Sequence, residues 1–131
     1  MNSGFVDNPI INLTQHFPTP AQLKAGVVEP AAKERIKSYL TFEGIPTEMG
    51  MKSRAEKLAL YVRGCGFKKA MIGGIPCFMP VLEKALLDQG VTVCYAFSER
   101  KSQDKQMPDG SVQKVAVFEH KGFYEVEPKV N

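Results

Sequence analysis

The chain has 131 residues, 44% of them hydrophobic, which suits one globular domain over residues 1–131 with a single core and leaves no room for a second domain. Its net charge of +3 comes from basic residues that are spread evenly among acidic ones, so it lacks the basic stripe that duplex DNA binding requires. No apolar run approaches the roughly 18 residues of a membrane span, and residues 1–7 lack the basic and apolar regions of a signal peptide. We therefore expect a cytoplasmic protein.

Cysteine and histidine give no sign of a disulfide framework or a metal site. Cys65, Cys77 and Cys94 are an odd number, which fits a reducing compartment, and Cys77 is expected to be buried because apolar residues follow it. No two cysteines have a CxxC spacing, and His16 and His120 are far apart, so no metal ion is expected. The sequence also carries no motif for a cofactor, and none is expected.

The N-terminal half predicts one strand and three helices. Residues 9–14 form a short strand, and Thr19 is the N-cap of a short helix, since a proline and a capping-box glutamine follow it. A second helical pattern covers residues 29–42. Thr47 opens the longest helix, in which apolar residues recur as they do on a face packed against a sheet, and Gly64 ends it.

The next part of the chain predicts a strand, a helix and a second strand. Residues 68–72 are a buried strand, and a glycine turn leads into a helix that stops at Gly90. Residues 91–97 are then apolar throughout. This order predicts a right-handed crossover between parallel strands.

The C-terminal part predicts an antiparallel edge. Residues 98–108 form a polar connection, and Asp109-Gly110 is a tight turn into a strand over residues 112–118. That strand alternates polar and apolar side chains at first, as a half-exposed edge strand does. Residues 122–126 predict one more short strand.

The whole pattern predicts an α/β fold. We expect a Rossmann-like, mainly parallel sheet with helices on both faces and a C-terminal antiparallel edge strand or hairpin. Residues 10–13, 70–72 and 93–97 should be neighbouring parallel strands. The exposed edge leaves backbone groups unpaired, which favours a homodimer.

Polar residues follow three of these strands, and ligands collect at the carboxyl ends of parallel strands. We therefore expect the three segments to converge on one cleft that binds an anionic small molecule. The candidate ligand-binding residues are Asn12, Thr14, Gln15 and His16 after the first strand, Gly73, Gly74 and Pro76 after the second, and Ser98, Arg100 and Lys101 after the third. Arg100 is expected to make the main anion contact, because its planar guanidinium pairs with a phosphate through two hydrogen bonds.

Each segment also has a structural interpretation. Thr14 and His16 would then satisfy loop backbone groups, the two glycines would only allow a sharp turn, and residues 98–102 would be a solvated loop. Catalysis has one candidate residue, His16 as an acid/base, because the sequence contains no GxSxG elbow and no paired acidic motif.

The segments Asn12-Leu-Thr-Gln-His16, Met71-Ile-Gly-Gly-Ile-Pro76 and Tyr95-Ala-Phe-Ser-Glu-Arg100 resemble a family of small uncharacterised bacterial proteins often found on mobile elements. More remotely, the layout is similar to the CRISPR-associated Rossmann fold (CARF) domains. That resemblance implies a dimer that binds cyclic oligonucleotides with the loops after its strands.

Three functions are compatible with the sequence. The first is a binding domain for a nucleotide-like anionic small molecule. The second is a small phosphodiester-cleaving or group-transfer enzyme that uses the same cleft, with His16 as acid/base and Arg100 stabilising charge. The third is a protein-interaction module without a ligand.

Overall fold

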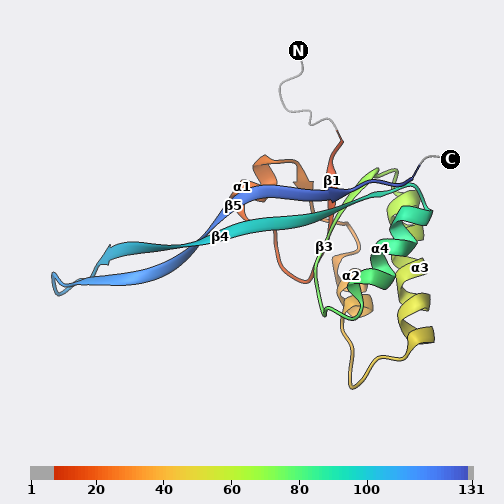
Figure 1. Cartoon of the computed structure of the whole chain (residues 1–131), viewed down its shortest axis with the longest axis horizontal. Helices are drawn as coiled ribbons and strands as arrows, with labels where there is room; N and C mark the ends of the chain where they lie inside the picture. The colour runs from red at the N-terminus through yellow and green to blue at the C-terminus, as the bar shows by residue number, and fades with distance from the viewer. Residues whose placement is uncertain (1–7, 130–131) are drawn as a thin grey trace, which may run out of the picture.

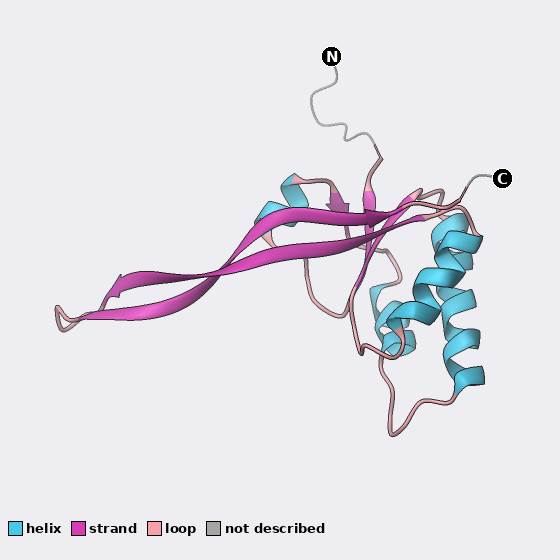
Figure 2. Cartoon of the chain, in the orientation of Figure 1, coloured by secondary structure: helices cyan, strands magenta, loops and turns pink. Residues whose placement is uncertain are grey.

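The computed structural model describes residues 8–129 and shows a mixed α/β fold built on one five-stranded sheet (Figure 2). The sheet order is β2-β1-β3-β4-β5, with β1 at Ile10–Leu13, β2 at Val27–Val28, β3 at Lys69–Ile72, β4 at Thr92–Gln106 and β5 at Val112–Val126. The first four strands are parallel and β5 is antiparallel to β4, so the predicted fold class is confirmed. The three predicted parallel neighbours are β1, β3 and β4. Residues 1–7, where no signal peptide was found, lie outside the described residues.

The four helices are α1 at Pro20–Lys24, α2 at Lys33–Leu40, α3 at Glu48–Gly64 and α4 at Met79–Asp88. The capping box predicted for α1 is present, because the Gln22 backbone N–H donates to Thr19 Oγ1 at 3.1 Å and the Thr19 N–H donates to Gln22 Oε1 at 3.0 Å. Thr47 caps α3 through one hydrogen bond, which its hydroxyl accepts from the Gly50 N–H. None of the helices in residues 8–129 has the length and apolarity that crossing a membrane requires.

The two faces of the sheet are covered unequally. On one face α2, α3 and α4 bury a continuous core that includes Ile36, Leu58 and Leu86 against Ile11 and Val93. Figure 1 shows α1 on the opposite side of the parallel strands, where it buries no residue. The smaller cluster on that face consists of strand residues, namely Ile10, Val27, Met71 and Cys94 with Phe123 packed against them.

Strand β2 and the start of α2 differ from the sequence prediction. Val27 and Val28 pair with Ile10 and Ile11 in a strand of two residues, which is too short to produce a recognisable pattern. The expected helix over 29–42 begins only at Lys33, because the chain first leaves β2. A hydrogen bond connects the segment before α2 to the long helix α3. The Ala32 N–H donates it to the Tyr61 hydroxyl at 3.3 Å.

The predicted polar connection over 98–108 is wrong. Strand β4 continues to Gln106, and β5 is one strand of 15 residues in place of two short ones. Cross-strand ion pairs stabilise this polar stretch, among them Lys101 with Glu119 at 2.7 Å and Lys114 with Asp104 at 3.5 Å. The pairing partner, which is distant in sequence, therefore decides the structure of residues 98–106.

The tight turn predicted at Asp109-Gly110 is confirmed. Gly110 has φ +89°, which favours glycine, and Asp109 Oδ1 accepts the Ser111 N–H at 2.9 Å. The hydrogen bond from the Ser111 hydroxyl, followed by this one from the Ser111 N–H, lowers the pKa of Asp109.

A bulge marks the point where the β4–β5 hairpin leaves the body of the molecule. The pairing register shifts between Phe97 and Ser98, and the residue opposite Phe97 is Gly122, with φ +135°. Beyond this point the two strands extend from the domain as a twisted arm (Figure 1). We call this arm, residues 97–122, the ribbon.

Candidate functional site: a cavity at the carboxyl ends of the parallel strands

The sheet has a topological switch point between β1 and β3. The chain leaves β1 toward β2 on one side and leaves β3 toward β4 on the other, so the loops after these neighbouring strands diverge. Ligands of open α/β sheets bind in the crevice at this place. A cavity of about 630 Å³ lies there, lined by Thr14, Gln15, His16, Thr19, Gln22, Leu40, Met71, Ile72, Gly73, Gly74, Ile75, Tyr95 and Ala96.

Asn12 holds the first of these loops from behind. Its side chain is fully buried, and its amide nitrogen donates to the His16 carbonyl at 2.8 Å and to Glu29 Oε1 at 2.6 Å. Its oxygen accepts from the Thr14 N–H at 3.0 Å and from the Thr14 hydroxyl at 2.7 Å. All four bonds lie within the protein, so Asn12 shapes the loop and does not face the cavity.

Lys33 fixes the direction of two peptide groups in the same loop. Its ammonium group donates to the carbonyls of Thr14 at 3.0 Å and His16 at 3.3 Å, and it pairs with Glu29 at 3.0 Å. In a planar trans peptide the N–H points opposite to the carbonyl. The N–H groups of Gln15 and Phe17 therefore point away from Lys33, and neither forms a hydrogen bond within residues 8–129.

Gly73 and Gly74, which also line the cavity, carry two more free amides. Neither N–H forms a backbone hydrogen bond in the described part of the chain. The space around them is tight, because a Cβ on Gly73 would lie 3.3 Å from Thr14 Cγ2 and one on Gly74 would lie 3.2 Å from Met79 Cε. The glycines thus allow the backbone of the β3 loop to approach the β1 loop closely.

The side chains that line the cavity include no lysine, arginine, aspartate or glutamate. Tyr95 donates its hydroxyl hydrogen to Glu83 at 2.6 Å, and burial together with this carboxylate raises the pKa of the phenol, so Tyr95 stays neutral. The Gln15 side chain donates to the Leu40 carbonyl at 2.9 Å. The imidazole of His16 is exposed and lies beside the unpaired amides, so it is accessible to a ligand.

The structure brings together five of the ten predicted ligand-binding residues, namely Thr14, Gln15, His16, Gly73 and Gly74. Asn12 lies behind the loop, and Pro76 does not line the cavity. Ser98, Arg100 and Lys101 lie on the ribbon, where Arg100 is paired with Phe118. They are separated from the cavity because β4 does not end at Phe97, as the sequence suggested, but continues beyond the bulge.

Sequence reasoning missed Lys33, Thr19, Gln22 and Tyr95 as parts of this region. For Lys33 a signal was present, since Glu29 precedes it by four residues and this spacing allows an ion pair. Its bonds to the loop carbonyls have no signature in the sequence, because Lys33 and His16 are 17 residues apart.

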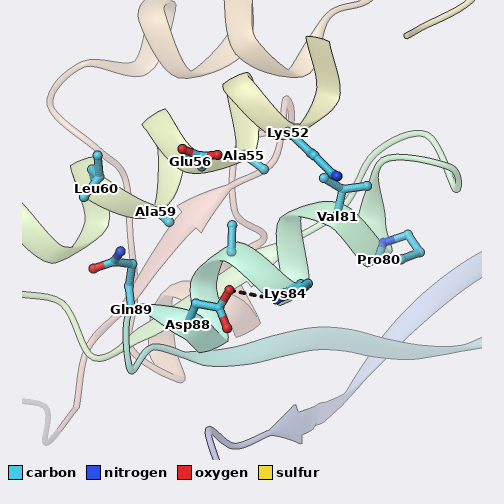
Figure 3. Close-up of a pocket in the computed structure, with 11 residues that line it drawn as sticks. Lys52, Ala55, Glu56, Ala59, Leu60, Pro80, Val81, Lys84, Asp88 and Gln89 are labelled. Atoms are coloured by element: carbon cyan, nitrogen blue, oxygen red, sulfur yellow. Dashed lines mark hydrogen bonds and ion pairs between the residues drawn. The ribbon is translucent and has the colours of Figure 1, made fainter. Parts of the chain in front are cut away.

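A second cavity of about 530 Å³ lies between α3 and α4, on the helical side of the molecule (Figure 3). Its floor contains Ala55, Ala59 and Ala85 with Val81, and charged residues surround it. Figure 3 shows that Lys84 is paired with Asp88 on the same helix, at 3.0 Å. Two of the charged groups around this cavity are therefore already paired with each other.

The cysteines do not form a site. Cys94 is buried, and burial followed by the charge of Glu125 raises the pKa of its thiol to about 11. Cys77 is exposed, so its predicted burial is wrong, because it precedes the first turn of α4 and only Phe78 after it turns into the core. Within residues 8–129 no group of three or more histidine, cysteine, aspartate or glutamate side chains is placed to hold a metal ion.

Comparison with protein families gives a match that covers most of the chain, residues 8–124. The chain belongs to the Uncharacterized protein MJ1673 family. This membership agrees with the expectation of an uncharacterised protein family. Neither the curated proteins nor the solved structures contain a match to this chain.

Proposed function

We propose that the protein binds a nucleotide-like anionic small molecule in the cavity at the switch point. The observation that carries this proposal is the set of unpaired backbone N–H groups of three residues that line the cavity on two adjacent loops, Gln15, Gly73 and Gly74. Backbone amides of this kind bind anions without a cationic side chain. His16 adds a further donor.

The rest of the lining fits the neutral part of such a ligand. Leu40, Met71, Ile72 and Ile75 provide apolar surface beside the polar loop residues. The volume of about 630 Å³ lies in the usual range for small-molecule sites. The CARF-like layout adds cyclic oligonucleotides to the ligands worth testing.

A thermal-shift screen tests the proposal, with ribonucleoside mono- and triphosphates and cyclic di- and tetranucleotides as probes and the unphosphorylated nucleosides as controls. A ligand at 100 times its dissociation constant stabilises a protein by about 2.7 kcal/mol. For a domain of this size that corresponds to a rise in Tm of about 10 °C. The proposal predicts such a shift for at least one phosphorylated probe and for no nucleoside.

Substitutions then locate the binding site. His16→Ala should weaken binding of the active probe at least about fivefold, because a hydrogen bond to a charged group is lost. Arg100→Ala is the matched control, since it removes a larger charge outside the cavity and should leave the affinity of a single chain unchanged. Normal binding by His16→Ala together with impaired binding by Arg100→Ala would show that the ligand binds at the ribbon. A thermal-shift screen in which no probe raises the Tm would refute the proposal.

Chromatography of the same mixtures tests the enzymatic alternative, in which His16 acts as acid/base. Loss of the probe with a dependence on His16 would favour phosphodiester cleavage over simple binding. Recovery of the intact probe supports the binding function.

A further inference from the structure

The ribbon is the part of the molecule that the proposed function leaves unexplained. The pairing of strand β4 with β3 begins at Thr92 and ends at Cys94. From Tyr95 onward the hairpin therefore has no third strand within residues 8–129. From the bulge to Gln106 it extends about 30 Å at the usual rise per residue. An isolated two-stranded hairpin of this kind is marginally stable in water.

The outer part of the ribbon also exposes large apolar side chains. Phe118 is 75% exposed and Val112 is 61% exposed, and both lie on the same strand. They share one face of β5 with Lys114 and Ala116, because side chains alternate along a strand. This face is therefore apolar except for one lysine.

The two edges of the ribbon differ in how they are protected. From Ser98 to Gln106 every residue of β4 is polar or charged, which is how natural sheets prevent pairing at an edge. From Val112 to Phe118 the sequence of β5 is Val-Gln-Lys-Val-Ala-Val-Phe, with a single charge. The edge of β5 is the one open to another strand.

A second copy of β5 fits this edge in one antiparallel register. With Ala116 opposite Ala116 of the partner subunit on a two-fold axis perpendicular to the sheet, residues of the same face meet, as this symmetry requires. In this register Val115 is opposite the partner's Val117, and Lys114 is opposite the partner's Phe118. No like charges face each other, and Phe118 has apolar diagonal neighbours, the partner's Val112 and the partner's Ala116.

We propose that the ribbons of two chains join through their β5 edges, about a two-fold axis at Ala116, into one four-stranded antiparallel sheet. The pairing satisfies the unpaired backbone groups of both edges and covers the apolar face of β5. It also carries the turn of each ribbon to the base of the partner's ribbon, one strand away from Tyr95 and Ala96, which line the cavity. The occupant of the edge is thus a second copy of the same chain.

Light scattering coupled to gel filtration tests the proposal on the full chain at 10–100 µM, a concentration of roughly the order at which weak dimers form. The wild-type protein should have twice the 14.5 kDa mass of one chain. Ala116→Lys places two ammonium groups opposite each other at the axis and should raise the dimer dissociation constant at least about tenfold. Ser102→Lys is the matched control, because Ser102 is the direct partner of Ala116 on the same face of the ribbon but belongs to the protected strand.

A charge exchange separates loss of pairing from misfolding. Ala116→Glu by itself should weaken the dimer in the same way, and mixing it with Ala116→Lys should restore a tight dimer that contains one chain of each variant. A monomeric wild-type protein at 100 µM, an unchanged dimer dissociation constant in Ala116→Lys, or a mixture that binds no more tightly than either variant alone would each overturn the proposal. Circular dichroism spectra equal to that of the wild type show that the variants are folded.

Discussion

Asn12 is the residue on which the geometry of the cavity loop depends most, and Asn12→Ala measures that dependence. The substitution removes two hydrogen bonds with Thr14, worth about 0.5–1.5 kcal/mol each, and one to the Glu29 carboxylate, worth about 1.5–3 kcal/mol. It also removes the bond to the His16 carbonyl, which Lys33 still satisfies. We therefore expect a loss of about 3–5 kcal/mol in the free energy of unfolding.

The partners of Asn12 lose these bonds inside the protein, because Asn12 has an exposed fraction of 0%. Urea denaturation followed by circular dichroism gives the free energy directly. The corresponding fall in Tm is about 12–20 °C. Gln103→Ala is the control, since it removes an exposed amide on the ribbon and should change the stability by less than about 0.5 kcal/mol.

A loss below about 1 kcal/mol for Asn12→Ala would refute the reasoning, because the four bonds would then contribute no more than a surface contact. Asn12→Asp gives an independent check. It keeps the two acceptor positions for Thr14 but replaces the donor to Glu29 by a carboxylate oxygen at about the same position. At pH 7 it should be nearly as unstable as Asn12→Ala, since two carboxylates would repel each other across a hydrogen-bonding distance.

Three further predictions concern the core, the reactivity of the thiols and the pH dependence of stability. Leu58→Ala should lower the free energy of unfolding, measured by urea denaturation, by about 2–5 kcal/mol because Leu58 is fully buried. Leu60→Ala, on the same helix at 56% exposure, should lower it by less than about 1 kcal/mol. Equal losses would contradict the packing of α3. A thiol reagent at pH 8 should modify Cys65 and Cys77 rapidly and Cys94 only after unfolding, and rapid reaction of all three would show that the sheet opens at β4. Folding raises the pKa of Cys94 from 9.0 to about 11, so the unfolded chain loses the thiol proton at a lower pH than the folded one. The free energy of unfolding should therefore fall as the pH rises from 9 to 11. Cys94→Ala should remove this part of the pH dependence.

Local signals in the sequence were sufficient for the helices with strong boundaries. Thr19 and Thr47 place the starts of α1 and α3 because an N-cap acts on backbone groups two or three residues away. The buried strands β1, β3 and β4 were predicted for a similar reason, since their apolar runs reflect burial on both faces of a parallel sheet. Their adjacency followed from the crossover rule.

Half of the predicted ligand-binding residues line the cavity, and the same kind of reasoning placed them there. The loops after β1 and β3 meet because both follow neighbouring parallel strands, and this brings His16 to Gly73 and Gly74. The prediction for Arg100 assumed that β4 ends where its apolar run ends. Polarity alone does not end a strand when a partner strand continues to supply backbone hydrogen bonds.

By itself, then, the sequence determined the fold class, the capped helices and the loops that line the cavity, because these depend on interactions between near neighbours and on the burial pattern of each strand. Only the tertiary structure decided that Lys33 bonds to the loop from behind, that Glu29 accepts a hydrogen bond from Asn12 and that residues 98–106 extend into a ribbon. These features depend on pairs such as Lys101 with Glu119 and Lys33 with His16, which are 17 or more residues apart in the chain. Their contact is a property of the folded chain and has no local pattern in the sequence.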